Sequence, residues 1–328
     1  MKNSSVIRFV ICLMLSAALL MSCALAEPIR VAVVQPLTHT SLNQIRDTIV
    51  SALESSDLEF EIVTRNAEGD TAALATILEN VKMDGVDILV PIATNTAQSA
   101  KVIYEDGAVP VVFAAVSDPV AAGLTGDDSF FITGVSNNIP AGEIVRLISD
   151  FQPDYQKIGF LYTSSETNSV STINAAKTYC DANGIAYEEV SIANLSELQT
   201  AMETLISKGI DALYTGNDNS IASAMSTYTD VAYGYGIPVY CGADSMVADG
   251  GFATIGVDYV LLGNQVADLV VRLAQGEMPE DIPYQTLSDY ARFVNLQAAE
   301  RIDMEIGEEI LSAYQVLVEA DGTSHFGK

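Results

Sequence analysis

The sequence repeats one pattern of strands and helices, and this repeat constrains the fold more than any other feature. Residues 85–89 read Gly-Val-Asp-Ile-Leu, and 124 positions later residues 209–213 read Gly-Ile-Asp-Ala-Leu. Three more expected strands match in the same order: 30–34 with 157–161, 60–63 with 187–190, and 109–111 with 237–239. Each half of the chain is therefore expected to form one β-α-β-α-β-α-β unit.

Short apolar runs alternate with helical stretches along the chain. The expected strands cover residues 30–34, 60–64, 86–91, 109–115, 157–162, 186–190, 211–214 and 238–241. Between them, stretches such as 70–83 place Leu74, Leu78 and Val81 on one helical face behind Asp70, a candidate N-cap. Apolar strands that alternate with helices are typical of parallel sheets with helices on both faces. The sequence therefore predicts an α/β protein with two doubly wound parallel-sheet lobes.

The first 26 residues have the pattern of an export signal. Lys2 and Arg8 precede an apolar stretch over residues 9–21. Residues 24–26, Ala-Leu-Ala, fit ordinary cleavage before Glu27, whereas residues 20–23 resemble a lipobox that would leave Cys23 as a lipidated N-terminus. Both interpretations remain open. Either one predicts a bacterial protein outside the cytoplasm, in the periplasm or anchored at the cell surface.

The composition excludes several classes of partner and cofactor. The net charge of −28 argues against nucleic acid and anionic membranes, because both need Lys and Arg to neutralise phosphate. Cys180 and Cys241 are the two cysteines inside the expected fold. They could pair in an oxidising compartment, although we favour two buried thiols. Since no metal or cofactor motif occurs, we expect neither a metal site nor a cofactor.

Polar clusters follow the expected strands, where ligands bind in open parallel sheets. Helix N-termini there supply N–H groups and positive dipoles, and two facing lobes would bring both sets of strand ends to one cleft. One polar residue is enough to cap a helix, yet these runs carry three to five. The candidate ligand-binding residues are Gln35, His39, Thr94, Ser117, Asp118, Ser136, Ser164, Ser165, Glu166, Asn168, Ser169, Asn217, Asp218 and Asp244.

The same stretches give the chain a family resemblance. Residues 34–39, 91–94, 112–120, 132–136, 161–169 and 256–259 carry it. Over about residues 29–306, the sequence resembles the extracytoplasmic substrate-binding proteins of ABC importers, of the tryptophan/tyrosine type. The resemblance implies the type I periplasmic-binding fold, in which two lobes joined by a three-strand hinge close around a small molecule. It also implies a monomer that serves a membrane permease, with an aromatic or other hydrophobic amino acid as ligand.

The expected lobes combine distant parts of the chain. We place residues 27–135 and 245–288 in the first lobe and residues 136–244 and 289–328 in the second. The chain would then cross between lobes near residues 135–136, 243–244 and 287–288. The first segment of each lobe follows from the duplication, and the later returns follow from the resemblance.

A zwitterionic ligand suggests roles for the polar residues. We expect Asp218 to bind the ammonium, with Asp118 or Asp244 as alternatives. Thr94, Ser117, Ser164, Ser165 and Asn168 are the candidates for the carboxylate. His39 either lies at the cleft edge, as the resemblance implies, or is a polar residue at a helix start. Glu166 either faces the cleft or caps its own helix.

Four aromatic residues could stack on the ligand side chain or pack in the core: Phe113, Tyr162, Tyr214 and Tyr259. We expect Phe113 to be a core residue, because it lies inside an apolar strand. The chain contains no tryptophan, so a site lined by that residue is excluded.

Catalysis has little support in the sequence. The chain has two histidines, His39 and His325, and no G-x-S-x-G elbow. We therefore expect a binding protein and no enzyme, although a hydrolase that uses His39 remains an alternative. The other alternative is a sensor that presents a nucleoside, sugar or peptide-like ligand to a membrane receptor.

Overall fold

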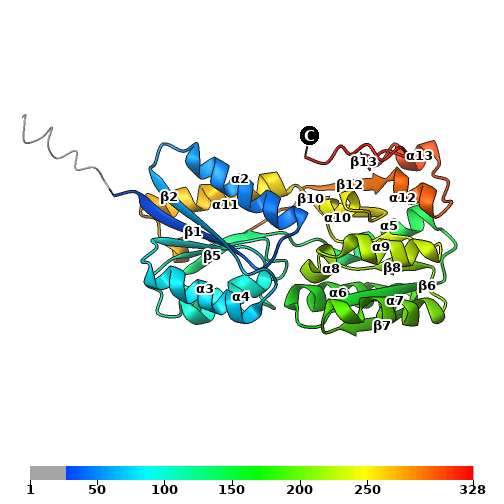
Figure 1. Ribbon diagram of the computed structural model, residues 1–328, viewed down its shortest axis with the longest axis horizontal. Helices are drawn as coiled ribbons and strands as arrows, with labels where there is room; N and C mark the ends of the chain where they lie inside the picture. Colours follow the sequence, from blue (N-terminus) through cyan, green and yellow to red (C-terminus); the bar gives the residue numbers. More distant parts are fainter. Residues whose placement is uncertain (1–26, 328) are drawn as a thin grey trace, which may run out of the picture.

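Two α/β lobes stand side by side in the computed structural model, which describes residues 27–327 (Figure 1). The sheet of the first lobe has the strand order β11-β5-β4-β3-β1-β2, and the sheet of the second has β13-β12-β10-β9-β8-β6-β7. The predicted export signal, the lipobox and Cys23 lie outside the described residues. Within residues 27–327, no helix is both long and apolar enough to cross a membrane.

The first lobe is built mainly from the N-terminal part of the chain. Its elements are β1 (Ile29–Gln35), α2 (Thr40–Glu54), β2 (Phe60–Asn66), α3 (Thr71–Met83), β3 (Ile88–Pro91), α4 (Thr94–Ile103), β4 (Val111–Ala114), the short helix Asp127–Ser129 and β5 (Ile132–Ser136). The helix α11 (Tyr259–Ala274), the short helix Pro279–Asp281 and β11 (Gln285–Thr286) join it later. In Figure 1, α11 lies beside α2.

The second lobe follows from residue 141. Its elements are α5 (Ala141–Phe151), β6 (Lys157–Thr163), α6 (Thr167–Asn183), β7 (Ala186–Ile192), the short helix Leu195–Glu197, α7 (Leu198–Ser207), β8 (Ala212–Tyr214), α8 (Asn219–Ala222), α9 (Met225–Gly234), β9 (Val239–Tyr240), α10 (Asp244–Ala248) and β10 (Ala253–Val257). The strand β12 (Tyr290–Asn295), the helices α12 (Leu296–Arg301) and α13 (Glu308–Leu311), and β13 (Gln315–Val318) complete it.

The two lobes share the topology that the duplication predicts. The order β4-β3-β1-β2 in the first sheet corresponds to β9-β8-β6-β7 in the second. In both sheets the outer pair is parallel, with Ile29 opposite Phe60 and Lys157 opposite Ala186. The one antiparallel pair in the described sheets is β10 with β12. The predicted fold class, with two doubly wound lobes, is confirmed.

The second crossing between lobes lies later than the sequence suggested. We expected the chain to return to the first lobe at residue 245, but β10 pairs with β9 and with β12 in the second sheet. The return therefore follows Val257, where α11 begins. The reason is that β10 is a fifth strand of the second sheet, equivalent to β5 in the first. The repeat that we recognised in the sequence covered only four strands of each half.

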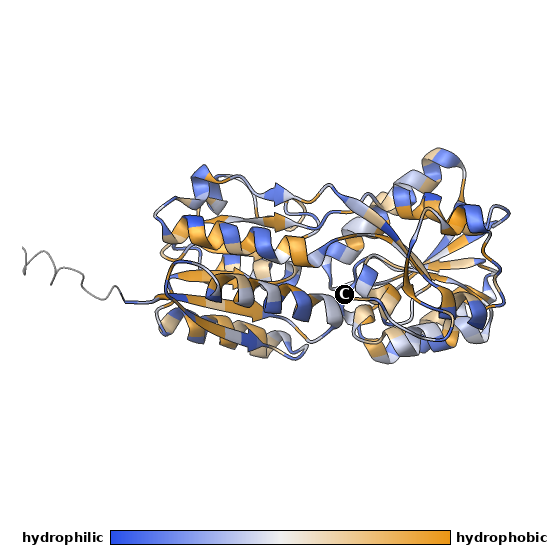
Figure 2. Ribbon diagram, turned by 90° about the horizontal axis from the view of Figure 1, so that it is seen from above, coloured by the Kyte–Doolittle hydropathy of each residue, from blue (hydrophilic) through white to orange (hydrophobic). Residues whose placement is uncertain are grey.

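Apolar strands lie between layers of helices in both lobes, as the hydropathy colours of Figure 2 show. The middle of β1, from Val31 to Val34, is fully buried. Cys180 on α6 and Cys241 after β9 are both free and buried, so the disulfide alternative is wrong. Burial raises the pKa of Cys180 to about 11, which keeps this thiol protonated.

Candidate functional site

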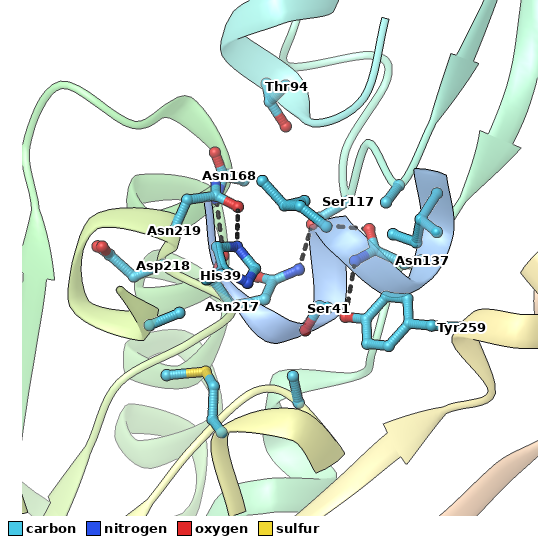
Figure 3. A pocket seen from close by; sticks show the side chains of 16 residues that line it. His39, Ser41, Thr94, Ser117, Asn137, Asn168, Asn217, Asp218, Asn219 and Tyr259 are labelled. Carbon is cyan, nitrogen blue, oxygen red and sulfur yellow. Dashed lines mark hydrogen bonds between the residues drawn. The ribbon is translucent and has the colours of Figure 1, made fainter. Parts of the chain in front are cut away.

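A cavity lies between the lobes, at the carboxyl ends of the strands (Figure 3). Together with adjoining open solvent, the space between its walls is about 370 Å³. The first lobe and the hinge contribute His39, Ser41, Leu42, Ile45, Thr94, Ala115, Ser117, Asn137 and Tyr259. The second lobe contributes Asn168, Asn217, Asp218, Asn219, Ala222, Ala243 and Met246.

Helix starts from both lobes surround the cavity. His39 precedes α2, Thr94 is the first residue of α4, and Asn219 is the first residue of α8. The residue before α4, Ala93, has a φ of 71°, which is costly for a residue with a Cβ. Such strain is tolerated where the surrounding fold fixes the backbone. Here it directs the N-terminus of α4, with Thr94, toward the cavity (Figure 3).

His39 crosses the cavity from the first lobe to the second. Its Nε2 lies 3.1 Å from Asn219 Oδ1. Burial is the main cause that lowers the pKa of His39, so the imidazole is neutral near pH 7. The other ring nitrogen, Nδ1, is buried and has no hydrogen-bond partner among residues 27–327. The side chain therefore lines the cavity and joins the two lobes.

Glu166 neither faces the cavity nor caps its own helix. Its side chain is 3% exposed and lies against the start of α8. Oε1 accepts from the backbone N–H and the hydroxyl of Ser220, at 2.9 and 2.7 Å. Oε2 accepts from the backbone N–H and Nδ2 of Asn219, at 2.9 and 2.7 Å. The expectation that Glu166 caps its own helix is corrected, because the partners come from a different helix, and Glu166 lines the outer groove between the lobes instead of the cavity.

Asp218 is the one carboxylate that lines the cavity among the described residues. It already accepts from the backbone N–H and the hydroxyl of Thr163, at 2.6 and 3.0 Å, and from the N–H of Ile221 at 2.9 Å. Burial, followed by the neighbouring charge of Glu166, raises the pKa of Asp218 to about 7. The side chain thus anchors β6 and caps α8 while it borders the cavity.

Several hydrogen bonds join the lobes around the cavity. Asn217 Nδ2 donates to Ser117 Oγ at 2.6 Å, and Ser171 Oγ donates to Asp118 Oδ2 at 2.6 Å. Thr40 Oγ1 donates to Asp249 Oδ2 at 2.7 Å, and the hydroxyls of Ser41 and Ser245 are in contact. These bonds form directly between the two lobes, so they belong to a closed arrangement.

Six of the predicted polar residues line the cavity: His39, Thr94, Ser117, Asn168, Asn217 and Asp218. Asp118 instead bonds the opposite lobe, as described above. Asp244 is buried nearby, and burial raises its pKa to about 7, but it does not line the cavity. Both acids were alternatives for the ammonium site, and the geometry places neither at the cavity wall.

The remaining predicted polar residues stabilise local structure around the site. Gln35 holds the loop before α2 through Leu37 O at 2.9 Å, and Ser136 donates to Ser117 O at 3.3 Å. Ser164 donates to Ile192 O at 3.1 Å. Ser165 faces an outer groove between the lobes, and Ser169 is fully buried behind Asn168. Local bonds to the backbone therefore use most of these side chains.

Tyr259 is the one predicted aromatic residue that lines the cavity. Phe113 is 1% exposed and packs in the core against Tyr284, with ring centroids 6.1 Å apart. Tyr214 is fully buried beside Phe160, and Tyr162 lies on the outer side near Glu189. These three rings come from strands that are covered on both faces, so strand position alone did not show which ring reaches the cavity.

Sequence reasoning missed several cavity residues. Asn137 follows β5 directly, and Asn219 stands in the polar run after β8, so position after a strand was the available signal. Ile45 and Met246 form part of the apolar wall. Their spacing in the sequence is the same as that of ordinary core residues, which gave no signal. Within residues 27–327, no cluster of His, Cys, Asp and Glu is placed to hold a metal ion.

Comparison with known proteins agrees with this geometry. The family model described as ABC transporter substrate binding protein matches residues 30–317. The "Tyrosine-binding protein" of Clostridioides difficile (strain R20291) is 29% identical over 282 residues, which cover 84% of this chain and 81% of that protein. A protein of Streptococcus pneumoniae, solved in complex with L-Trp, is 30% identical, with a TM-score of 0.82 over 88% of this chain and 99% of that one.

A second solved relative differs in conformation. The ligand-free, open structure of a substrate-binding protein from Clostridium difficile is 29% identical and covers 88% of this chain and 98% of its own, but its TM-score is 0.65. At nearly equal identity, the higher score to the L-Trp complex fits the direct bonds between the lobes described above. These likenesses confirm the type I periplasmic-binding fold. Because the family model matches residues 30–317, which are most of the chain, the chain belongs to the ABC transporter substrate-binding protein family.

Proposed function

We propose that the protein is the extracytoplasmic solute-binding component of an ABC importer and that it captures an aromatic amino acid between its lobes. The observation that carries this proposal is the cavity itself. It combines buried polar atoms that lack partners within the described chain with an apolar wall. The relatives named for tyrosine and solved with L-Trp support the choice of ligand.

The start of α4 is the candidate site for the ligand carboxylate. Ala93 offers no side-chain cap, and no described residue accepts from the backbone N–H groups of Thr94, Asn95 or Thr96. The hydroxyl of Thr94, which is 1% exposed, also lacks a partner among these residues. Free N–H groups at the positive end of a ten-residue helix favour an anion.

An apolar wall completes the cavity for the ligand side chain. It is formed by Leu42, Ile45, Ala222, Met246 and the ring of Tyr259. Methionine adapts to irregular shapes and makes favourable contacts with aromatic rings, and tyrosine provides a flat apolar face. A planar hydrophobic side chain is therefore a better fit to this wall than a polyol, which would leave its hydroxyls without partners.

Closure of the lobes would bury the ligand. The chain crosses between the sheets after β5, after β10 and between β11 and β12, which supplies a three-segment hinge. A ligand that contacts both lobes favours the closed arrangement through its differential contacts. The closed monomer would then deliver the ligand to a membrane permease after export of the mature chain.

Thermal-shift screening of the mature protein tests this function. The panel contains L-tryptophan, L-tyrosine, L-phenylalanine, L-leucine, adenosine and myo-inositol. A ligand at a hundred times its dissociation constant should add about 2.7 kcal/mol to the free energy of unfolding. We expect the largest shift with an aromatic amino acid. A shift with adenosine or myo-inositol alone would support the sensor or sugar-binding alternatives and contradict the proposal.

A further inference from the structure

Glu166 is a buried carboxylate that contacts two amides of the cavity wall without lining the cavity. Besides its bonds to Asn219 and Ser220, Oε2 accepts from Asn168 Nδ2 at 3.3 Å. An ionised carboxylate only accepts hydrogen bonds. Glu166 therefore determines which end of each amide turns toward it, and it leaves the opposite end for the cavity.

The orientation of the Asn219 amide determines which ring nitrogen of His39 carries the proton. Its Nδ2 faces Glu166, so its Oδ1 faces His39 Nε2 at 3.1 Å. A carbonyl oxygen cannot donate, so Nε2 must carry the imidazole proton. The neutral ring then has a lone pair at Nδ1, which is buried at the cavity and unpartnered within residues 27–327.

Asn168 is oriented in the same sense. Its Nδ2 donates to the backbone carbonyl of Asn217 at 3.0 Å as well as to Glu166. Its Oδ1 is the remaining end, and this atom is buried with no partner in the described chain. Asn168 is 3% exposed and lines the cavity. It therefore offers an acceptor, whereas a ligand carboxylate would require a donor.

We propose that Glu166 is a positioning residue that makes His39 Nδ1 and Asn168 Oδ1 hydrogen-bond acceptors, which together receive the ammonium end of the amino acid. This inference rests on the proposed function and gives the ligand a direction in the cavity. The ammonium lies toward α6 and α8, and the carboxylate lies toward α4. Asn168 therefore moves from the carboxylate site to the ammonium site. Together with His39, it replaces Asp218 as the expected partner of the ammonium.

Electrostatics support this direction. The start of the 17-residue helix α6 would present a partial positive charge of roughly half a unit, which disfavours an ammonium. The carboxylate of Glu166 directly precedes α6 and lies against the start of α8, so it offsets this partial charge. Asp218 adds a second carboxyl group at the wall, although its three hydrogen bonds already engage both of its oxygens. By contrast, the start of α4 has no buried acid among its hydrogen-bond partners in the described residues.

The substitution Glu166→Gln tests the positioning role with two ligands that differ only at the ammonium. L-tryptophan and 3-(indol-3-yl)propanoate are titrated by calorimetry into the wild type and the variant. Each oxygen of Glu166 now accepts from one backbone N–H and from side-chain donors, so the NH₂ group of a glutamine replaces an acceptor in either orientation and the amides must reorient. We expect about tenfold or greater loss of affinity for L-tryptophan, and a change within about threefold for the propanoate. The matched charge control, Glu203→Gln on the exposed face of α7, should leave both affinities unchanged.

An equal loss for both ligands would mean that Glu166 only maintains the fold, and it would overturn the inference. Unchanged affinity for L-tryptophan would overturn it as well. If no amino acid binds the wild type, the proposed function itself fails. The two failures are therefore distinguishable.

A spectroscopic measurement tests the tautomer directly. The chain has two histidines, so ¹⁵N-histidine labelling gives spectra that are simple to assign, with His325 as an internal reference. With saturating L-tryptophan, His39 should be the neutral tautomer protonated at Nε2, and Glu166→Gln should shift the tautomer populations. A wild-type His39 protonated at Nδ1, or at both nitrogens, would contradict the inference even if L-tryptophan binds.

Discussion

Asn217 of the second lobe donates a hydrogen bond from Nδ2 to Ser117 Oγ of the first lobe at 2.6 Å. Ser117 Oγ in turn donates to Asn137 Oδ1 at 3.1 Å, and Asn137 Nδ2 donates to Tyr259 OH at 3.3 Å. Asn137 stands at the first crossing between lobes, and Tyr259 begins α11 just after the second. A bond that forms on closure is thus connected to two hinge segments and to the cavity wall.

Direct bonds between the lobes should tune affinity without changing ligand preference. Ser171→Ala removes the bond to Asp118, which lies outside the cavity. A hydrogen bond of this kind contributes about 0.5–1.5 kcal/mol, so we expect roughly two- to tenfold weaker binding of L-tryptophan, with faster dissociation. Calorimetry and stopped-flow fluorescence measure both quantities. Ser171→Thr keeps the hydroxyl and is the matched control; equal affinity in the alanine variant would contradict this role.

Thr94 should contribute to binding through its hydroxyl. Thr94→Val preserves the shape of this buried side chain but removes its donor, so the ligand carboxylate loses one hydrogen bond. Bonds to charged groups contribute about 1.5–3 kcal/mol, and affinity for L-tryptophan should fall by about ten- to hundredfold. Tryptamine, which lacks the carboxylate, should bind both proteins equally. A comparable loss for tryptamine would show that valine disturbs the cavity generally.

The buried carboxyl group of Asp244 should make stability depend on pH. Burial, followed by the nearby charge of Asp258, raises its pKa from 3.8 to about 7. The folded protein holds this proton more tightly than the unfolded chain, so the stabilising contribution is lost as pH rises from about 4 to about 7. Asp244→Asn cannot ionise and should be more stable than the wild type at pH 8, by up to about 4 kcal/mol.

Chemical denaturation of the ligand-free proteins at several pH values measures this effect. The advantage of Asp244→Asn should shrink as pH falls and disappear below about pH 4. An advantage that is the same at every pH would have to come from packing and would contradict the linkage with ionisation.

The contact between α11 and α2 depends on the absence of a side chain at Gly263. A Cβ there would lie 2.7 Å from Thr48 Cβ and 3.2 Å from the backbone oxygen of Ile45. Gly263→Ala should therefore lower the free energy of unfolding by about 1–3 kcal/mol, although alanine is the better helix former. Gly234→Ala at the end of α9, where nothing lies within 4 Å, is the control and should be neutral or slightly stabilising. Thermal unfolding that ranks the two variants in the opposite order would contradict this packing argument.

The topology was largely predictable because the sequence contains an internal duplication. Matching segments such as 85–89 and 209–213 predicted equivalent strands, and β3 and β8 occupy equivalent positions in their sheets. The fifth strand, β10, was not predicted. It is five residues long, contains Gly256, and was not matched to β5 in the sequence. The second hinge crossing was therefore placed too early.

The direction of the ligand could not be predicted from the sequence. It depends on which end of each amide, Asn168 and Asn219, faces the cavity. Hydrogen bonds to Glu166 fix both orientations, and Glu166 lies 53 residues before Asn219 in the chain. Polar residues after a strand indicate that a site exists, but they do not say whether an amide there donates or accepts. That information comes from contacts between separate helix starts.

A crystal structure of the mature protein with L-tryptophan tests the central claim most directly. We predict one ligand between the lobes, with its carboxylate on Thr94 Oγ1 and the first N–H groups of α4. Its ammonium should lie within about 2.7–3.2 Å of His39 Nδ1 and Asn168 Oδ1, and its ring should lie against Tyr259 and Met246. L-tryptophan bound in the reverse direction would contradict the assigned polarity. Its absence from the cavity at saturating concentration would contradict the proposed function.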